Sequence, residues 1–214
     1  MTVLDQVMHT IKYGLIPSDS ELEESGQEME LTERMAHYKV PGFSIAFVDR
    51  GELTFRMGYG VMQAGSNLKV TPDTIFQAGS ISKPVTGLVA LHMVEKGDLD
   101  LDADVNEMLL SWKIPESKHT KRRGNGDQPK VTLRGLLSHS AGVNIRGYRG
   151  YLSDRTLPTL QQVLNGEKPL ANSNAVRVTQ KPGKEFKYSG GGYLVVQQLI
   201  EDVTGRKLAD LAQE

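Results

Sequence analysis

The sequence predicts an α+β fold, in which a short antiparallel sheet precedes a longer helical region. Large apolar side chains recur at every second position along 43–48 and again along 52–59, on either side of Asp49-Arg50-Gly51. Alternation of period two around a glycine-containing turn is typical of a β-hairpin. From residue 80 to residue 205 the apolar spacing is helical and the connections are rich in glycine. Strands followed by a run of helices are typical of the α+β class.

The residues before the hairpin predict two helices joined by a polar linker. Apolar side chains in residues 3–11 recur at helical spacing, and a second helix is expected to end near Tyr38, before Pro41-Gly42. Residues 15–26 between them are polar and acidic. We therefore expect an N-terminal helix and linker over residues 1–25 and the main domain over residues 26–214.

Three further helices are expected after residue 80. The first has an apolar stripe and ends at Gly97, the second covers 133–139 with Thr132 as its N-cap, and the third covers 193–203 and ends at Gly205. The stripe of the first helix consists of Val85, Leu88, Val89 and Met93.

Two clear strands are few for a chain of 214 residues. An isolated hairpin is at best marginally stable, and its edges must be paired or covered. The strand over 43–48 is apolar on both faces, so we expect it to be covered on both sides. Either helices cover the hairpin, or further strands come from elsewhere.

Composition excludes several classes of function. The chain has 25 Lys and Arg against 26 Asp and Glu, a net charge of −1, which argues against a general nucleic-acid binder. It has no cysteine, so a thiolate metal site and a cysteine nucleophile are excluded. The histidines lack metal-ligand spacing, and the Gly190–Gly192 run lacks the context of a dinucleotide site. We expect no metal and no cofactor.

The sequence predicts no membrane span, because no apolar run approaches the ~18 residues that a span requires. The first 14 residues do not resemble a secretory signal, because Asp5 and His9 interrupt their apolar residues. A cytoplasmic location is therefore expected, or a periplasmic or secreted one if a leader was removed.

The most informative segment for chemistry is residues 79–84, Gly-Ser-Ile-Ser-Lys-Pro, at the start of a predicted helix. Ser80 is predicted to be the N-cap, and Lys83 then lies on the same helical face, so its amine can reach the Ser80 hydroxyl. Such a pair supplies a nucleophile with a neighbouring base. The alternative is that Ser80 is only a cap and Lys83 only a solvated side chain, because Ser-x-x-Lys is common by chance.

Two other segments accompany this one in a recognisable order. Residues 136–142 read Leu-Leu-Ser-His-Ser-Ala-Gly, and residues 186–193 read Phe-Lys-Tyr-Ser-Gly-Gly-Gly-Tyr. Together with residues 41–46 and 74–83, their order and spacing resemble the serine β-lactamase and penicillin-binding-protein superfamily. The similarity is greatest to class C β-lactamases and to their esterase and D-aminopeptidase relatives, and it covers about residues 26–214.

The resemblance implies a fold and a role for each of three residues. The fold would be β-lactamase-like, with a helical subdomain beside part of an antiparallel sheet flanked by helices. Ser80 would be the acylated nucleophile, and Lys83 would share its proton. Tyr188, which matches the tyrosine of the family's Tyr-x-Asn element, would complete the base and protonate the leaving group. The alternative for Tyr188 is a packed aromatic side chain, and His139 is expected to pack or cap near the site.

The sequence departs from the family pattern at two places. The asparagine of Tyr-x-Asn is replaced by Gly190, which puts recognition of a β-lactam or peptide amide in doubt. No segment after Tyr188 matches the family's Lys/His-Thr/Ser-Gly motif, which lies on a strand beside the nucleophile and contributes an oxyanion donor and contacts to a substrate carboxylate. We expect the chain to lack the C-terminal strands that carry this motif.

The resemblance implies a serine hydrolase that acts through an acyl-enzyme on an ester, amide or β-lactam carbonyl. Esterase or D-amino peptidase activity is favoured, with a small molecule or short peptide as the substrate. The alternative is a catalytically incomplete fragment or subunit that needs a C-terminal complement chain.

Overall fold

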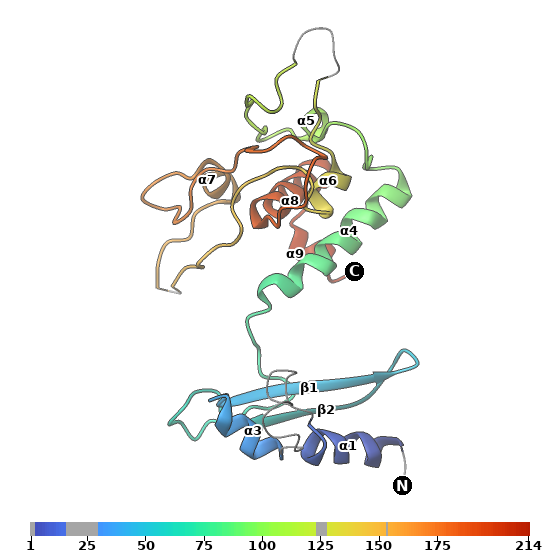
Figure 1. Cartoon of the computed structure of the whole chain (residues 1–214), viewed down its shortest axis with the longest axis vertical. Coiled ribbons are helices and arrows are strands. Elements are labelled where there is room, and N and C mark those ends of the chain that lie inside the picture. Colours follow the sequence, from blue (N-terminus) through green and yellow to red (C-terminus); the bar gives the residue numbers. More distant parts are fainter. Residues whose placement is uncertain (1–2, 16–29, 123–127, 153) are drawn as a thin grey trace. The chain divides into compact units, whose positions relative to one another are not determined.

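The computed structural model describes residues 3–15, 30–122, 128–152 and 154–214. It divides into two compact units, Met1–Gln77 and Ala78–Glu214 (Figure 1). Residues 16–26 of the expected linker lie outside the described residues. The expected boundary between residues 25 and 26 stays a prediction.

The first unit contains the β-hairpin that the sequence predicts. Its strands are β1 (Gly42–Asp49) and β2 (Glu52–Gly60), which pair antiparallel with a register shift after Phe47. The two turn residues, Arg50 and Gly51, have φ values of 51° and 83°. Positive φ at both positions matches the right-handed twist of the strands and is typical of a two-residue hairpin turn. The hairpin is the whole sheet within the described residues.

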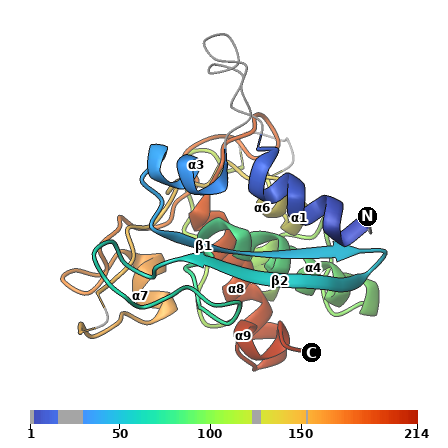
Figure 2. The same ribbon diagram turned by 90° about the horizontal axis from the view of Figure 1, so that it is seen from below.

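Two helices lie on one face of this hairpin, beside β1 (Figures 1 and 2). They are α1 (Val3–Tyr13) and α3 (Leu31–His37). Phe43 and Ile45 of β1 are half-buried on this face and line a groove with residues of both helices. The alternate side chains of β1, including Val48, are exposed. Within this unit the described residues cover β1 on one face, and the expectation that its other face is covered too stays a prediction.

The second unit is helical and is organised around α8 (Gly190–Thr204). Helix α8 packs against each of the other α-helices in this unit (Figure 1), and its side chains Val195, Val196 and Leu199 are fully buried. The other elements are the 3₁₀ helix η1 (Gly79–Ile81), α4 (Ser82–Lys96), α5 (Val105–Met108), α6 (Leu133–Leu137), α7 (Leu160–Asn165) and α9 (Leu208–Leu211). A hairpin followed by these helices confirms the α+β class. Among the described residues, no helix is both long and apolar enough to cross a membrane.

Helix α4 buries only part of the apolar stripe that the sequence predicts, since Met93 is buried and Val89 is half-buried against the core. Thr86, Ala90 and Met93 are buried, whereas Val85 and Leu88 of the expected stripe are exposed. Apolar residues occur almost all round this helix. Spacing alone therefore did not identify the buried face, and only Met93 of the predicted stripe is fully buried.

The ends of α6 and α8 follow the sequence signals closely. The Thr132 hydroxyl accepts a hydrogen bond from the Gly135 N–H at 3.1 Å, as expected of an N-cap. Helix α6 ends at Leu137, earlier than the predicted 139. Helix α8 starts three residues before the predicted 193 and is followed by Gly205 in the left-handed conformation.

Loss of the Thr132 cap is expected to destabilise the second unit measurably. In Thr132→Ala the Gly135 N–H loses its acceptor, which should lower the free energy of unfolding by about 1 kcal/mol. Thr132→Ser keeps the hydroxyl and serves as the matched control. Urea unfolding of the three proteins measures the effect, and equal midpoints for the alanine and serine variants would contradict it.

Candidate active site

The predicted nucleophile lies in a helical turn instead of capping one. Ser80 is the middle residue of η1, which continues directly into α4, and the residue at the N-cap position of α4 is Ile81. An N-cap side chain accepts a hydrogen bond from a backbone N–H, whereas within the described residues the Ser80 hydroxyl bonds the side chains of Lys83 and Tyr188. The prediction that Ser80 caps the helix is therefore wrong. The hydroxyl is consequently not used for capping. Pro84 falls in the first turn of α4, where the missing N–H removes no helical hydrogen bond.

The structure brings together all three residues predicted for catalysis. The Lys83 ammonium donates a hydrogen bond from Nζ to Ser80 Oγ at 3.2 Å. The Tyr188 hydroxyl donates to the same oxygen at 2.9 Å, from a position 108 residues away in the sequence. Two ionisable side chains therefore meet at one serine hydroxyl. Loss of the tyrosine proton would reverse the second bond, so that Ser80 donates to the phenolate.

The charges around Tyr188 favour its ionised form. Its neighbour Lys83 is the main cause that lowers the pKa of Tyr188, and the hydrogen bond with Ser80 is the second. Arg146 acts in the same direction at longer range. The Lys83 Nζ lies 4.9 Å from the centre of the Tyr188 ring. A cation at this distance stabilises a phenolate, as the proposed roles of these residues require.

His139 packs against the ring of Tyr188. Its Nδ1 accepts a hydrogen bond from the Ser189 N–H at 3.1 Å, and its ring centre lies 4.4 Å from that of Tyr188. Burial, with a smaller effect from Lys83, lowers the pKa of His139 and keeps the imidazole neutral, as an acceptor nitrogen must be. These contacts agree with the expectation that His139 packs near the site.

The segment after Tyr188 is held by hydrogen bonds to the loop that contains Asn144. The close contact between them explains why glycine occurs at position 191. The Ser189 hydroxyl caps α8 by accepting from the Gly192 N–H at 2.9 Å, and it donates to the Asn144 carbonyl at 2.6 Å. A Cβ on Gly191 would lie only 2.8 Å from that carbonyl oxygen. Glycine at position 191 permits this close approach because it has no Cβ. The glycine run was visible in the sequence, but the loop that it contacts was not predicted.

A cavity of about 370 Å³ adjoins Ser80 and Lys83. Its wall includes Arg146 and Tyr148 from the loop that contacts the start of α8. From the sequence, Tyr148 could either line a pocket or lie at the surface as a loop aromatic residue, and in the structure it lines the cavity. Arg146 was not among the predicted site residues, because no motif marks it. The remaining lining residues are Gly79, Ser82, Thr86, Gly147, Gly190, Tyr193, Leu194, Gln197 and Leu208.

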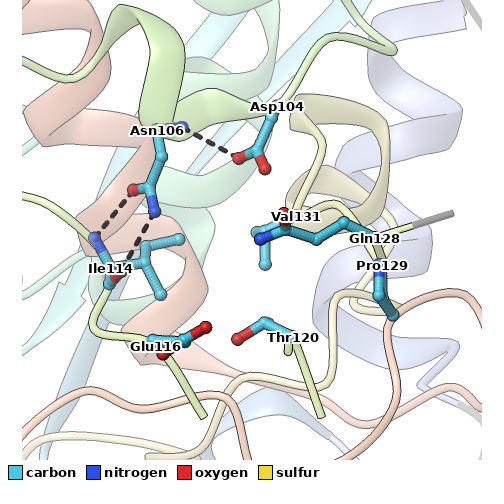
Figure 3. Close-up of a pocket in the computed structure, with 8 residues that line it drawn as sticks. All are labelled: Asp104, Asn106, Ile114, Glu116, Thr120, Gln128, Pro129 and Val131. Atoms are coloured by element: carbon cyan, nitrogen blue, oxygen red, sulfur yellow. Dashed lines mark hydrogen bonds between the residues drawn. The ribbon is translucent and has the colours of Figure 1, made fainter. Parts of the chain in front are cut away.

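A smaller cavity of about 70 Å³ lies next to α5 (Figure 3). Both amide atoms of Asn106 bond the backbone of Ile114, at 3.0 and 2.8 Å, and Asp104 accepts from the Asn106 N–H at 3.0 Å. These bonds hold α5 to the segment that follows it, so the cavity wall has a structural role. In the described parts of the chain, no three His, Cys, Asp or Glu side chains are grouped as metal ligands.

Comparison with known proteins identifies the family of this chain. The family model described as Beta-lactamase matches residues 30–214. The chain belongs to the Beta-lactamase family. This confirms the resemblance to serine β-lactamases and penicillin-binding proteins that the motifs indicated.

Individual relatives in the Beta-lactamase family agree with the match. Protein flp of Staphylococcus aureus (strain MRSA252) is 28% identical over 165 residues, which is 77% of this chain and 30% of that protein. The structure of the octameric penicillin-binding protein homologue from Pyrococcus abyssi superposes with a TM-score of 0.63 at 30% identity, covering 86% of this chain and 40% of that one. EstCE1, described as a hydrolase with promiscuous acyltransferase activity, gives a TM-score of 0.62 at 26% identity, covering 85% and 47%. The chain thus spans less than half the length of these proteins, and its β-lactamase-like fold is confirmed.

Proposed function

We propose that this chain is a serine hydrolase of the Beta-lactamase family that acts through an acyl-enzyme, with Ser80 as its nucleophile. The observation that supports this most strongly is the convergence of Lys83 and Tyr188 on Ser80 Oγ, at 3.2 and 2.9 Å. A hydroxyl that is bonded to two proton-transferring groups is the arrangement that nucleophilic catalysis by serine requires.

The reaction follows from these contacts. Ser80 Oγ attacks the substrate carbonyl carbon while its proton passes to the Tyr188 phenolate, whose charge Lys83 stabilises. The carbonyl oxygen becomes an oxyanion, for which the backbone N–H of Ser80, in the first turn of η1, is a candidate donor. Tyr188 then gives the proton to the leaving group as the carbonyl–leaving-group bond breaks. Water releases the acid from Ser80 by the reverse sequence of proton transfers.

We favour as the substrate an ester, or a D-amino acid amide whose amide group is held by another part of the site, over a β-lactam. Gly190 stands where the family's Tyr-x-Asn element has its asparagine, so this position offers no side-chain amide to a substrate amide. An ester does not need a side-chain amide at this position, because it has no amide group to be bound. The likeness to EstCE1, described as a hydrolase, is consistent with this choice.

A panel of three chromogenic substrates tests the preference. The folded chain is assayed with p-nitrophenyl acetate, D-alanine p-nitroanilide and nitrocefin, with Ser80→Ala measuring the background of each. We expect the ester or the D-alanine derivative to have the highest kcat/KM relative to its background. Hydrolysis of nitrocefin alone would contradict the preference. Turnover of none of the three by a folded chain would favour the alternative that it needs a C-terminal complement.

The pH dependence of ester turnover should depend on Lys83. Because Lys83 lowers the pKa of Tyr188 and the phenolate is the active form, kcat/KM should rise with pH through a pKa below the ordinary value near 10. In Lys83→Met the pKa of Tyr188 should return toward that value, so the rising limb should move to higher pH. A profile of kcat/KM against pH measures the shift. A variant with wild-type turnover and an unmoved limb would remove Lys83 from the mechanism.

A further inference from the structure

The charged groups in the wall of the active-site cavity are all cationic. Among the described residues that line it, Lys83 and Arg146 carry charge, and none is an aspartate or glutamate. The Lys83 ammonium is already bonded to the Ser80 hydroxyl. Arg146 is therefore the cation in the wall that does not bond the Ser80 hydroxyl.

The Arg146 side chain is available to a ligand. It is exposed, and within the described part of the chain its guanidinium forms no hydrogen bond or ion pair. The Arg146 charge lowers the pKa of Tyr188, so the guanidinium lies close enough to the reacting groups to act on them electrostatically. A guanidinium presents paired N–H donors in a plane, which matches the two oxygens of a carboxylate.

The backbone of Arg146 is fixed relative to the reacting groups. Its carbonyl accepts a hydrogen bond from the Gly190 N–H at 3.2 Å, and the Ile145 carbonyl accepts from the Gly191 N–H at 3.0 Å. Both donors follow closely after Tyr188 in the sequence. Ile145 itself has a φ of 61°, a conformation that is strained for a β-branched residue. Strain of this kind persists where surrounding contacts hold it, and it is common at functional sites.

The position of Gly190 also makes room for this loop. A Cβ at residue 190 would lie 3.2 Å from the Arg146 carbonyl oxygen and 3.5 Å from Tyr148 Cε2. The first of these contacts is tighter than an ordinary van der Waals contact. The residue that departs from the family pattern is thus the one against which the Arg146 loop packs.

We propose that Arg146 is a specificity-determining residue that binds a carboxylate group of the substrate through its guanidinium, so that the site prefers anionic over neutral substrates. This inference rests on the proposed hydrolase function and assigns the substrate class of the same site. The carboxylate belongs either to the acyl part or to the leaving group of the substrate, and both present the same two oxygens.

Two matched pairs of esters test the proposal and distinguish these sources. The first pair is p-nitrophenyl hydrogen adipate and p-nitrophenyl hexanoate, in which only the acyl part differs in charge. The second pair is 4-acetoxybenzoate and its methyl ester, in which only the leaving group differs. We expect the anionic member of at least one pair to have a kcat/KM about tenfold higher at low salt, as one exposed charge-assisted bond allows. High salt should reduce this ratio, because exposed charges are screened.

The variants separate recognition of charge from a structural role. Arg146→Ala should abolish the preference ratio, Arg146→Lys should restore part of it, and Arg149→Ala, an exposed arginine of the same loop outside the cavity wall, should leave the ratio unchanged. A ratio near one for both pairs in the wild type, or a preference that survives Arg146→Ala, would overturn the proposal.

A binding measurement keeps this test distinct from that of the hydrolase function. Calorimetric titration of the Ser80→Ala chain with monomethyl adipate and with methyl hexanoate requires no turnover. Tighter binding of monomethyl adipate that is lost when Arg146→Ala is added would support the proposal even if the chain hydrolyses no ester. Equal affinity for the two ligands in the Ser80→Ala chain would overturn it even if the chain is an active esterase.

Discussion

Replacement of Ser80 with alanine is expected to reduce kcat/KM for p-nitrophenyl acetate by about 10,000-fold or more, toward the uncatalysed rate. Removal of a catalytic serine has effects of this order in other serine hydrolases, because no second group can form the acyl-enzyme. Lys83 and Tyr188 would lose their common acceptor but keep their positions, since His139 packs against the ring of Tyr188 and α4 carries Lys83. The fold should therefore survive the change, and steady-state kinetics measure the loss.

Ser82→Ala is the matched control for this prediction. Ser82 lies two residues away at the start of α4, and its carbonyl, which the substitution keeps, is the group that bonds Thr86. We expect its kcat/KM to stay within a few-fold of the wild type. An equal loss in both variants would point to disruption of the turn and would contradict the assignment of Ser80 as the nucleophile.

Tyr188→Phe is expected to lower kcat/KM about 1,000-fold, within the range for loss of a general acid–base group. The phenylalanine ring keeps the packing on His139 but removes the oxygen that lies 2.9 Å from Ser80 Oγ. The rise of kcat/KM with pH that is attributed to the Tyr188 phenolate should disappear with it. Both effects are read from one pH profile for each protein.

Tyr193→Phe separates this role from general aromatic packing. The Tyr193 ring also lies near Lys83, with 5.5 Å between Nζ and the ring centre, but its hydroxyl donates to the Leu137 carbonyl at 3.1 Å. Loss of that hydroxyl should affect stability more than turnover. If Tyr193→Phe and Tyr188→Phe lowered kcat/KM equally, the assignment of the proton transfer to Tyr188 would be contradicted.

The part of the site that depends on local spacing could be predicted from the sequence. Ser80 and Lys83 are three residues apart in a helical segment, so their proximity follows from helical geometry alone. Tyr188 could not be placed beside them in this way, because 108 residues separate it from Ser80, and only the family resemblance indicated its role. Arg146 was not predicted at all, because in the sequence it has neither a local partner nor a motif.

The errors of the sequence-based predictions also have physical causes. A serine before a helical run is a common N-cap, but here a short 3₁₀ helix precedes α4, and Ser80 is the middle residue of that 3₁₀ helix. The apolar residues of α4 are spread around the helix, so the buried face is decided by packing and not by spacing. The hairpin, the N-cap of α6 and the glycine that ends α8 were predicted correctly, because each depends on a few neighbouring residues.

The central claim is that Ser80 is an activated nucleophile, and covalent labelling tests it most directly. The folded chain is incubated with a fluorophosphonate, its intact mass is measured, and the modified peptide is sequenced by mass spectrometry. We predict a single adduct on Ser80 that is absent in Ser80→Ala and forms much more slowly in Tyr188→Phe. A folded chain that gains no adduct, or one that is labelled on another residue and equally in Ser80→Ala, would contradict the claim.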